Sequence, residues 1–481
     1  MAYRHGVYVR EQDTGMVAPA SGTAGLQVAV GTAPVHLLDR PEEAVNTPIL
    51  VQSLAEAMLA VGYHDDFARY TLCDAVSAAF QVVGAGPLVL INVLDPAKHS
   101  EAIPETELPV QDGAAVLARE GVLLGELVVK KDGEALTEGT DYLAEHTEDG
   151  VRLTLTADGK GAGAAALTVS GKALDPGKVT KADIVGGVDV ATGKEKGLEV
   201  VRQVFPKLGL TPGLLTAPRW SMEPEVAAVL QAKTTELNGV FRCQCIVDVD
   251  SRTGGARVYT AVKEKKEAQG LSDPRCYAVW GYGRVGETVY SGSALAAALQ
   301  ARTDSAQGDI PYVSPSNKTL TLGGMCLADG TEVLLDQAQA NTVNGYGAAT
   351  WLNLNGWRLW GNRTAAYPGK TDTKDSFFPC RRYMDWRANS FILTYFQRVD
   401  NPLNKRLIEA VVDSENVRGN GYVALGAAAK DSIEYRAEEN PVTDLMNGKV
   451  TFHHTITPYP PAEQMEDVIE FDPEALASAL A

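Results

Sequence analysis

The sequence has no long hydrophobic run. Its longest notable stretch is Pro87-Leu-Val-Leu-Ile-Asn-Val-Leu94, which has the length of a buried strand. A membrane-spanning helix needs roughly 20 apolar residues, so none is expected. No apolar stretch follows Met1, so no secretory signal is expected either. These absences argue against direct membrane insertion.

Basic residues are also scarce. The chain of 481 residues has 43 Lys and Arg against 61 Asp and Glu, which gives a net charge of −18. Sequence-independent binding to nucleic acid depends on basic side chains that neutralise phosphates, and anionic membrane surfaces attract the same residues. The composition therefore excludes both as general partners, although a local basic patch stays open.

Residues and motifs that are typical of catalytic sites are few. The chain has 7 histidines, and it contains no Gly-x-Ser-x-Gly elbow, no phosphate-binding loop ending in Gly-Lys-Ser/Thr and no His-Glu-x-x-His helix. The 6 cysteines show no disulfide framework, which predicts reduced thiols in a cytosol. They are Cys73, Cys243, Cys245, Cys276, Cys326 and Cys380. We expect no catalytic residues, no cofactor and no enzymatic activity.

Two short motifs resemble metal ligands. Cys243 and Cys245 would share one face of a strand, but a zinc site needs further ligands and no second pair lies near in sequence. His453 and His454 would lie on opposite faces of their strand, so they cannot chelate together. A buried structural pair of thiols is favoured over a metal site, and no metal is expected.

A glycine motif is the strongest competing signal. Gly281-Tyr-Gly-Arg-Val-Gly286 follows a predicted strand, and Asp304 lies about 20 residues further on, as in a dinucleotide-binding unit. However, Thr288-Val-Tyr-Ser291 separates the third glycine from the next helix-forming residues, whereas a pyrophosphate needs a helix N-terminus. An ordinary glycine-rich loop is favoured. A nucleotide-binding oxidoreductase that uses the Gly281–Gly286 loop is the alternative.

The pattern over most of the chain is α/β. Gln27–Val30 and Leu88–Leu94 read as buried strands, and Thr47-Pro48 reads as a helix start whose helix ends at Gly62. Continuous apolar strands between amphipathic helices predict a mainly parallel sheet covered by helices. Further helices are expected near residues 70–82, 221–239, 260–269, 293–303, 381–399 and 402–416.

Between about Leu108 and Asp183 the pattern changes. Three Asp-Gly pairs, at 132–133, 149–150 and 158–159, separate short alternating runs. Asp-Gly between alternating strands predicts hairpins. We therefore expect an antiparallel β-sandwich of about 70 residues, inserted into the α/β body.

Both ends of the chain carry isolated strand-like runs. Gly6-Val-Tyr-Val-Arg10 precedes small and polar residues that provide slack, and Asp467-Val-Ile-Glu-Phe471 follows the stiff Pro458–Pro461 segment. Such runs can add a strand to the open sheet edge of another subunit. Frayed tails are the base-rate alternative for any terminus. We interpret both ends as arms, because they alternate β-branched and aromatic residues.

Several spaced blocks resemble the contractile tail sheath proteins of phages and related injection particles. They are Val28–Pro34, Pro212–Pro218, Asn355–Thr364, Arg381-Arg382, Pro402–Asn404 and Glu438–Leu445. The resemblance covers essentially the whole chain. The inserted β-sandwich resembles the extra domain of sheath proteins from Gram-positive phages and prophages.

The resemblance implies a structural role. Sheath subunits form hexameric rings that stack helically around an inner tail tube, and their arms join sheets of neighbouring subunits. Contraction then drives the tube through a host envelope. The implied partners are further copies of the chain, the inner tube protein, and baseplate and tail terminator proteins. The implied location is the virion tail or a phage-tail-like particle, assembled in the host bacterial cytoplasm.

The family also suggests residues for these contacts. The arm contacts would be Val7, Tyr8, Val9, Val468, Ile469 and Phe471. Candidate tube-facing or lateral contacts in the basic C-terminal third are Arg381, Arg382 and Arg387, for which intrachain pairing with carboxylates is the alternative.

The expected domains follow from these patterns. They are an N-terminal arm (1–24), the first part of the α/β sheath domain (25–107), the inserted β-sandwich (108–183), the α/β core (184–355), the C-terminal domain (356–462) and the C-terminal arm (463–481). The rivals to an assembly protein are the oxidoreductase and a surface or capsid protein that displays the sandwich.

Overall fold

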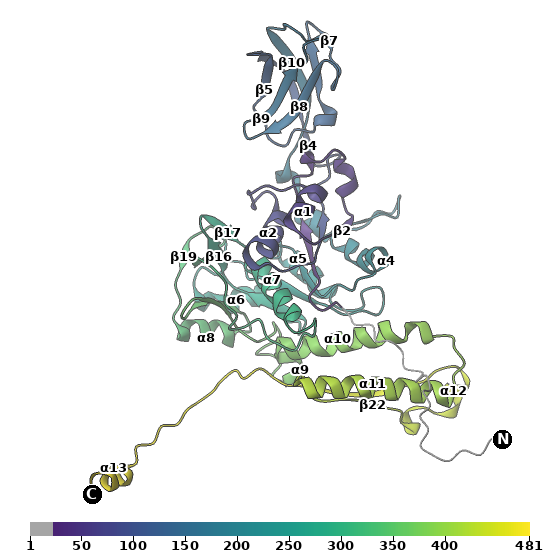
Figure 1. Ribbon diagram of the computed structural model, residues 1–481, viewed down its shortest axis with the longest axis vertical. Coiled ribbons are helices and arrows are strands. Elements are labelled where there is room, and N and C mark those ends of the chain that lie inside the picture. Colours follow the sequence, from purple (N-terminus) through teal and green to yellow (C-terminus); the bar gives the residue numbers. More distant parts are fainter. Residues whose placement is uncertain (1–22) are drawn as a thin grey trace, which may run out of the picture.

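The chain forms a long molecule with three parts along its axis (Figure 1). The computed structural model describes residues 23–481. The inserted segment stands at one end, the α/β body lies in the middle, and a helical hairpin with the outgoing C-terminal segment lies at the other end. Most of the predicted N-terminal arm, with Val7, Tyr8 and Val9, lies outside the described range. Across residues 23–481, no helix has the length and apolar character to cross a membrane.

A six-stranded sheet is the centre of the body. Its order is β15-β14-β13-β1-β3-β2, and every neighbouring pair is parallel except β2 with β3. The strands are β1 (Gln27–Gly31), β2 (Pro48–Val51), β3 (Leu88–Asn92), β13 (Leu214–Thr216), β14 (Gln244–Asp248) and β15 (Cys276–Val279). The predicted mainly parallel sheet is confirmed.

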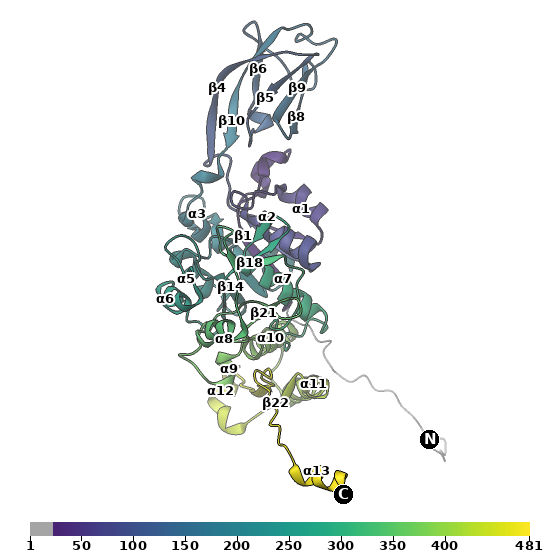
Figure 2. The ribbon, with the colours of Figure 1, turned by 90° about the vertical axis from the view of Figure 1, so that its left-hand side faces the viewer.

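Helices cover both faces of this sheet (Figure 2). One face carries α1 (Leu54–Val61), α2 (Thr71–Ser77) and α7 (Gly292–Ser305), and the other carries α3 (Lys181–Val185), α5 (Pro224–Ala232) and α6 (Val262–Ala268). Nearly every residue of α7 is buried, which is why its sequence shows no clear polar face. The mixed α/β class predicted from the sequence is confirmed.

The predicted helix start at Thr47-Pro48 is wrong. Pro48 begins the strand β2, and the helix α1 begins six residues later at Leu54. Ser53 is the actual N-cap, since its side chain accepts a hydrogen bond from the Glu56 N–H. Proline fits β2 because this strand is at the edge of the sheet, where a missing N–H breaks no ladder bond.

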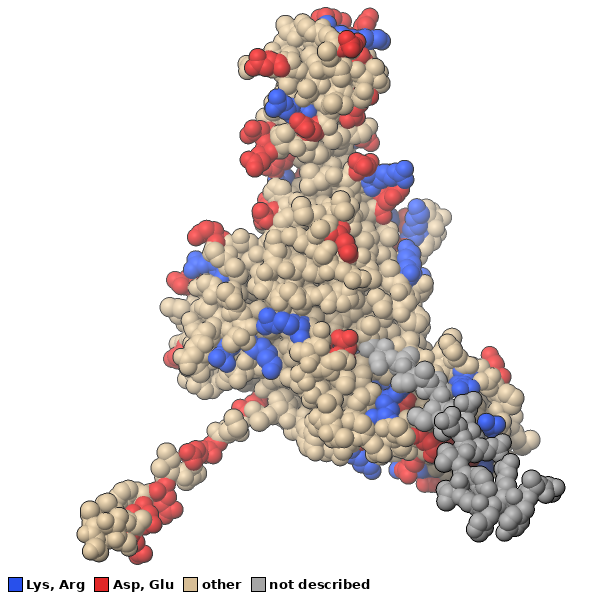
Figure 3. Space-filling view, in the orientation of Figure 1, with Lys and Arg blue, Asp and Glu red and all other residues tan. Residues whose placement is uncertain are grey.

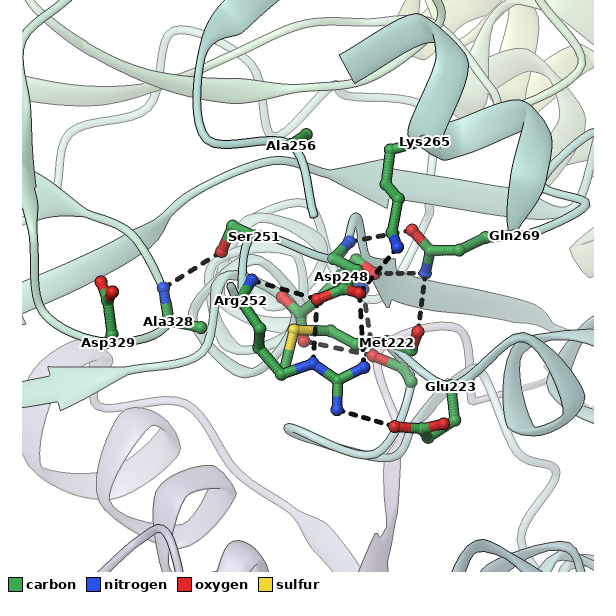
Figure 4. A network of polar contacts seen from close by, with 12 residues as sticks. Met222, Glu223, Asp248, Ser251, Arg252, Ala256, Lys265, Gln269, Ala328 and Asp329 are labelled. Atoms are coloured by element: carbon green, nitrogen blue, oxygen red, sulfur yellow. Dashed lines mark hydrogen bonds and ion pairs between the residues drawn. The ribbon is translucent and has the colours of Figure 1, made fainter. Parts of the chain in front are cut away.

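The carboxyl end of β14 is filled by the protein's own polar groups (Figure 4). Arg252 donates to Asp250 at 2.9 Å and to Glu223 at 2.7 Å. Lys265 lies 3.0 Å from Asp250, whose backbone N–H donates to Gln269 at 2.8 Å. Open α/β sheets usually bind ligands at this end of their strands. Here the ion pairs fasten the loop to the neighbouring helices.

The second half of the body adds small antiparallel sheets. The strands β16 (Tyr282–Val285), β17 (Thr288–Tyr290), β18 (Gly324–Cys326) and β19 (Glu332–Val333) form one sheet, and β20 (Thr350–Asn353) pairs with β21 (Trp357–Trp360). The helix α8 (Gln337–Gly345) packs beside β20. Trp351 and Trp357 belong to the same hydrophobic core as the central sheet, so these sheets extend the body.

The inserted segment has two antiparallel sheets and its own hydrophobic cluster. One sheet has the order β4-β10-β6-β7 and the other β5-β9-β8. The strands are β4 (Ser100–Pro109), β5 (Ala114–Leu117), β6 (Val128–Lys131), β7 (Glu134–Ala135), β8 (Tyr142–Thr147), β9 (Gly150–Leu155) and β10 (Ala166–Leu174). Side chains such as Leu153 and Val169 fill the space between the sheets. The first strand begins at Ser100, eight residues before the boundary expected from the sequence.

Histidines lie where the inserted segment meets the body. The ring of His146 on β8 lies edge-on to the ring of His36, with centroids 5.3 Å apart, and its Nε2 lies 3.1 Å from the His36 carbonyl oxygen. Arg69 of the body forms an ion pair with Glu120 of the inserted segment. Burial, with His146, His64 and Arg69 nearby, lowers the pKa of His36 to about 3. Burial also lowers the pKa of His146. Both rings are therefore neutral in the docked arrangement.

This junction predicts a pH dependence of stability. A histidine whose pKa is lowered in the docked state takes up a proton on undocking, so docking is strongest above pH 6.5 and weakens below it. At pH 5, His36 alone would weaken docking by about 2 kcal/mol. Replacing His36 by Gln should therefore flatten the fall of the apparent Tm between pH 7 and pH 5. His453→Gln, far from the junction, is the matched control. Equal pH slopes in the native chain and the His36 variant would contradict the expectation.

Candidate assembly interface

The C-terminal domain pairs a helical hairpin with a two-stranded sheet. The elements are α10 (Phe378–Tyr395), α11 (Lys405–Leu425), β22 (Ala428–Glu434), α12 (Val442–Met446) and β23 (His453–Pro458). The predicted helices near 381–399 and 402–416 correspond to α10 and α11, and Asn404 caps α11 by accepting from the Leu407 N–H. The strands β22 and β23 pair with each other, and neither outer edge is paired with another described strand.

Gly419 sets the distance between α11 and the sheet. A Cβ at this position would lie 2.0 Å from the Asp431 carbonyl oxygen of β22. Because contacts that short do not occur, only glycine lets the helix lie directly on the strand. The close approach buries Asp431 among the helices.

The buried guanidinium group of Arg387 pairs with the carboxylate of Asp431. Arg387 of α10 donates to Asp431 at 2.8 and 3.0 Å and to Glu415 of α11 at 2.9 Å. Tyr383 and His454 also bind Asp431, at 2.8 and 2.9 Å. Burial alone would raise the pKa of Asp431, but these hydrogen bonds lower it to about 2. The charged network joins both helices to both strands.

The predicted surface contacts of three arginines are wrong. Arg381, Arg382 and Arg387 are all buried. Arg381 pairs with Asp385 at 2.8 Å, and Arg382 pairs with Asp304 of α7 at 2.6 Å. Their guanidinium groups face carboxylates of their own chain, which was the alternative reading of these residues. A cluster of basic residues in the sequence of a helix does not show whether their side chains form a surface patch or a buried network.

Arg382 also binds the first residues of the described chain. Its Nη2 donates to the Ala24 carbonyl oxygen at 2.8 Å. On the other side, the Thr23 hydroxyl donates to the Thr211 carbonyl oxygen at 2.5 Å. Residues 23 and 24 are therefore clamped at the joint between the α/β body and the C-terminal domain.

The C-terminal segment leaves from the end of β23. Glu463 accepts a hydrogen bond from Arg363 at 2.9 Å, and the Arg363 guanidinium lies 3.8 Å from the centre of the Phe377 ring. From residue 464 onward every residue is exposed, and no regular structure is present until α13 (Pro473–Leu480). Sequence reasoning missed the Arg363–Glu463 anchor, because no local pattern joins residues 100 positions apart.

The exposed segment is apolar and acidic. Val468, Ile469 and Phe471 are 84%, 87% and 74% exposed. Residues 459–481 include six carboxylate side chains and no Lys or Arg, and Figure 3 shows the acidic side chains along the segment. The run expected as a strand at 467–471 has no strand partner within the described chain.

The glycine motif is a hairpin rather than a phosphate-binding loop. Gly283 lies within β16, and a Cβ there would lie 2.5 Å from Leu295. A Cβ on Gly281 would lie 2.2 Å from Met325. These glycines therefore make room for the protein's own core. Asp304, the expected ribose ligand, is occupied by Arg382 and Gln300.

The thiol pair is also structural. Cys243 and Cys245 are buried, and burial raises the pKa of both thiols. Among residues 23–481, no group of three or more His, Cys, Asp or Glu side chains is placed to hold a metal ion. Within the described residues, the outer edge of β23 has no strand partner, and the C-terminal segment leaves the domain exposed.

Comparison with known proteins identifies the family. No model of a known protein family matches the chain. The chain is 30% identical to the tail sheath protein of Burkholderia phage BcepMu, over 98% of each chain. It is 26% identical to a putative prophage major tail sheath protein of Pseudomonas aeruginosa, over 65% of this chain and 78% of that protein. The chain belongs to the contractile phage tail sheath family, whose members are structural proteins and not enzymes.

Solved structures share the fold. The sheath of the extracellular contractile injection system PVC, in the contracted state, matches with a TM-score of 0.58 at 13% identity, over 99% of each chain. The contracted helical sheath of the anti-feeding prophage matches with a TM-score of 0.57 at 15% identity, over 97% of this chain and 98% of that one. The nucleotide-binding alternative has no support from the relatives or from the hairpin geometry.

The buried network predicts a large effect of one substitution. Arg387→Met would remove the guanidinium group that Asp431 and Glu415 share, leaving Asp431 with Tyr383 and His454 and Glu415 with Arg418. Removal of one partner from a buried ion pair costs about 3–5 kcal/mol. The apparent Tm and the protease resistance of the C-terminal domain should both fall. Arg406→Met, on the exposed face of α11, is the matched control and should change neither. An unchanged Tm in the Arg387 variant would show that the network does not hold the domain together.

Proposed function

We propose that this chain polymerises through its two terminal arms into hexameric rings stacked helically around an inner tail tube. Contraction of this sheath drives the tube through a host envelope. The partners are further copies of the chain, the tube protein, and baseplate and tail terminator proteins. The particle is a virion tail or a phage-tail-like device assembled in the bacterial cytoplasm. Nucleic acid binding and membrane insertion have no part in this role.

One observation carries the proposal. A two-stranded sheet lies beside the point where an exposed segment leaves the chain, and the outer edge of β23 has no strand partner among the described residues. The outer edge of β22 faces α11, where Asn416 binds both main-chain groups of Ile433. Unpaired edges with free N–H and C=O groups are templates for another strand. A strand added from another copy would give main-chain hydrogen bonds without a large side-chain interface.

The arm has the sequence that such an added strand needs. Ile469 and Phe471 alternate, so they share one face of an extended chain and could cover a neighbour's sheet. Val468 would contribute to the other face. By the same reasoning, Val7, Tyr8 and Val9 are the contact residues proposed for the N-terminal arm. The clamp on residues 23 and 24 would transmit force from that arm to the body.

The domain division follows from this role. We propose arms at 1–24 and 463–481, an α/β sheath domain at 25–99 and 175–355, an inserted β-domain at 100–174, which begins with β4 and ends with β10, and a C-terminal domain at 356–462. Among these parts, the arms and the C-terminal domain form the lasting links between subunits. The α/β body changes its lateral contacts during contraction, when packed interfaces switch between discrete arrangements.

Deletion of an arm tests the proposal. Removing residues 463–481 or residues 1–20 should leave the body folded, because residues 464–481 are exposed and the core lies elsewhere. Tube formation, seen by negative-stain microscopy, should be lost in both cases. Ile469→Pro removes one N–H from the proposed added strand and should impair assembly. Gln464→Pro, which lies before that strand and outside α13, is the matched control and should leave assembly unchanged. Normal tubes from truncated chains would refute arm exchange.

Salt should weaken assembly. The arm carries six carboxylates and no basic residue, while Lys430 is exposed on β22. Ions at about 0.5 M shorten the range of exposed charge interactions several-fold relative to about 0.01 M. The critical concentration for polymerisation should therefore rise with salt, and Lys430→Gln should reduce that dependence. Indifference of assembly to ionic strength would remove the charge argument.

A further inference from the structure

The last helix, α13, packs against no other element of residues 23–472. Asp472 caps α13 by accepting from the Glu474 and Ala475 N–H groups at 2.9 and 3.2 Å. Leu476 and Leu480 are four residues apart and share one side, and they are 51% and 79% exposed. An isolated helix of this length is marginal in water. It therefore needs an apolar surface to rest on.

The C-terminal domain has such a surface uncovered. A groove of about 680 Å³ lies between the start of α11 and the α12 segment. Ile408 and Val412 form one apolar row of α11, and Leu403, Tyr435 and Leu445 complete the lining. The size falls in the range of pockets that take up a small apolar group or peptide.

The groove and the outgoing arm lie at opposite ends of the domain. Glu434 lines the groove and pairs with His453, whereas Pro458, at the start of the arm, pairs with Ala428. The two ends of this sheet are about 20 Å apart. Figure 1 shows α12 at one end of the hairpin and the arm leaving at the other. The Arg363–Glu463 contact fixes the arm at its exit.

We propose that α13 of one copy docks in the groove of a second copy, with Leu476 and Leu480 in contact with Ile408, Val412 and Leu445. Residues 459–472, when extended, span roughly 45 Å, enough to pass from one domain to the next. The contact joins two different surfaces, so it repeats head to tail and builds an open or ring-shaped assembly. The inference rests on the proposed arm exchange and adds a second anchor to the same arm.

The docking is apolar in character. The groove rim carries Glu409, Asp413 and Glu434 as well as Lys405, and α13 itself begins with Asp472 and Glu474. Charge therefore does not attract this helix, and salt should not weaken the contact. This separates the helix anchor from the salt-sensitive part of the assembly.

Cross-linking between tagged copies tests the position of the helix. One full-length variant carries Leu480→Cys, and another, with a different tag, carries Leu445→Cys. All six natural cysteines are buried, so a short bifunctional maleimide should react mainly at the introduced thiols. A covalent dimer that carries both tags is expected on assembly. Val423→Cys, exposed near the other end of α11, replaces Leu445→Cys in the control and should give no dimer.

The remaining outcomes decide between alternatives. A chain that carries both Leu480→Cys and Leu445→Cys and cross-links only within itself would show that the helix folds back, which overturns the proposal. Tubes that form without the Leu480–Leu445 product would also overturn it and leave arm exchange standing. Failure of the unmodified chain to form tubes would instead refute the proposed function.

Point variants give a second measurement that does not depend on added thiols. Leu476→Ser and Leu480→Ser should each raise the critical concentration for polymerisation about tenfold, because each removes the burial of one leucine. Glu474→Gln and Ser478→Ala, on the opposite side of α13, should leave it unchanged. Equal effects on both sides of the helix, or none on either side, would contradict docking through the leucines.

Discussion

The buried guanidinium of Arg382 is the contact on which the arrangement of the molecule depends. It belongs to α10 of the C-terminal domain, it pairs with Asp304 of α7 in the body, and it binds the backbone at Ala24, where the described chain begins. One side chain thus fixes the hairpin against the body and holds the root of the N-terminal segment. A buried ion pair of this kind contributes little net stability relative to an apolar contact, but it tolerates only one geometry.

A second buried arginine joins several elements within the C-terminal domain. Arg387 joins α10, α11 and β22 through two carboxylates, while Gly419 lets the helix approach the strand closely enough for the network to close. The result is a platform in which α11 covers one edge of the sheet and the outer edge of β23 has no strand partner among the described residues. In the proposed arm exchange, a platform that shares load between subunits would have to keep its shape while its surroundings move. Directional, charged contacts inside the platform serve this purpose better than a fluid apolar interface.

The sequence predicted the elements whose conformation is set by residues close together in the chain. The continuous apolar strand at Leu88–Asn92 and the helix near 402–416 follow from composition and spacing, and both are present. The helix start at Thr47-Pro48 failed because edge-strand pairing, a tertiary effect, decided the conformation of Pro48. Arg381, Arg382 and Arg387 were misread because their carboxylate partners include Asp304, 78 residues away from Arg382. Nothing in a single sequence reveals such a pairing, or the groove between α11 and α12.

The inserted segment is connected to the body through two neighbouring strand ends, away from the buried arginine networks. It enters at Ser100 and leaves at Leu174, two residues that face each other across a single antiparallel pair of strands, so the chain ends that it connects lie about 5 Å apart. It stands at the far end of the molecule from the C-terminal domain (Figure 2). The segment therefore adds no length between the parts of the body that come before and after it in the chain. The chain therefore carries the inserted segment as an appendage whose two connections occupy one small area of the body.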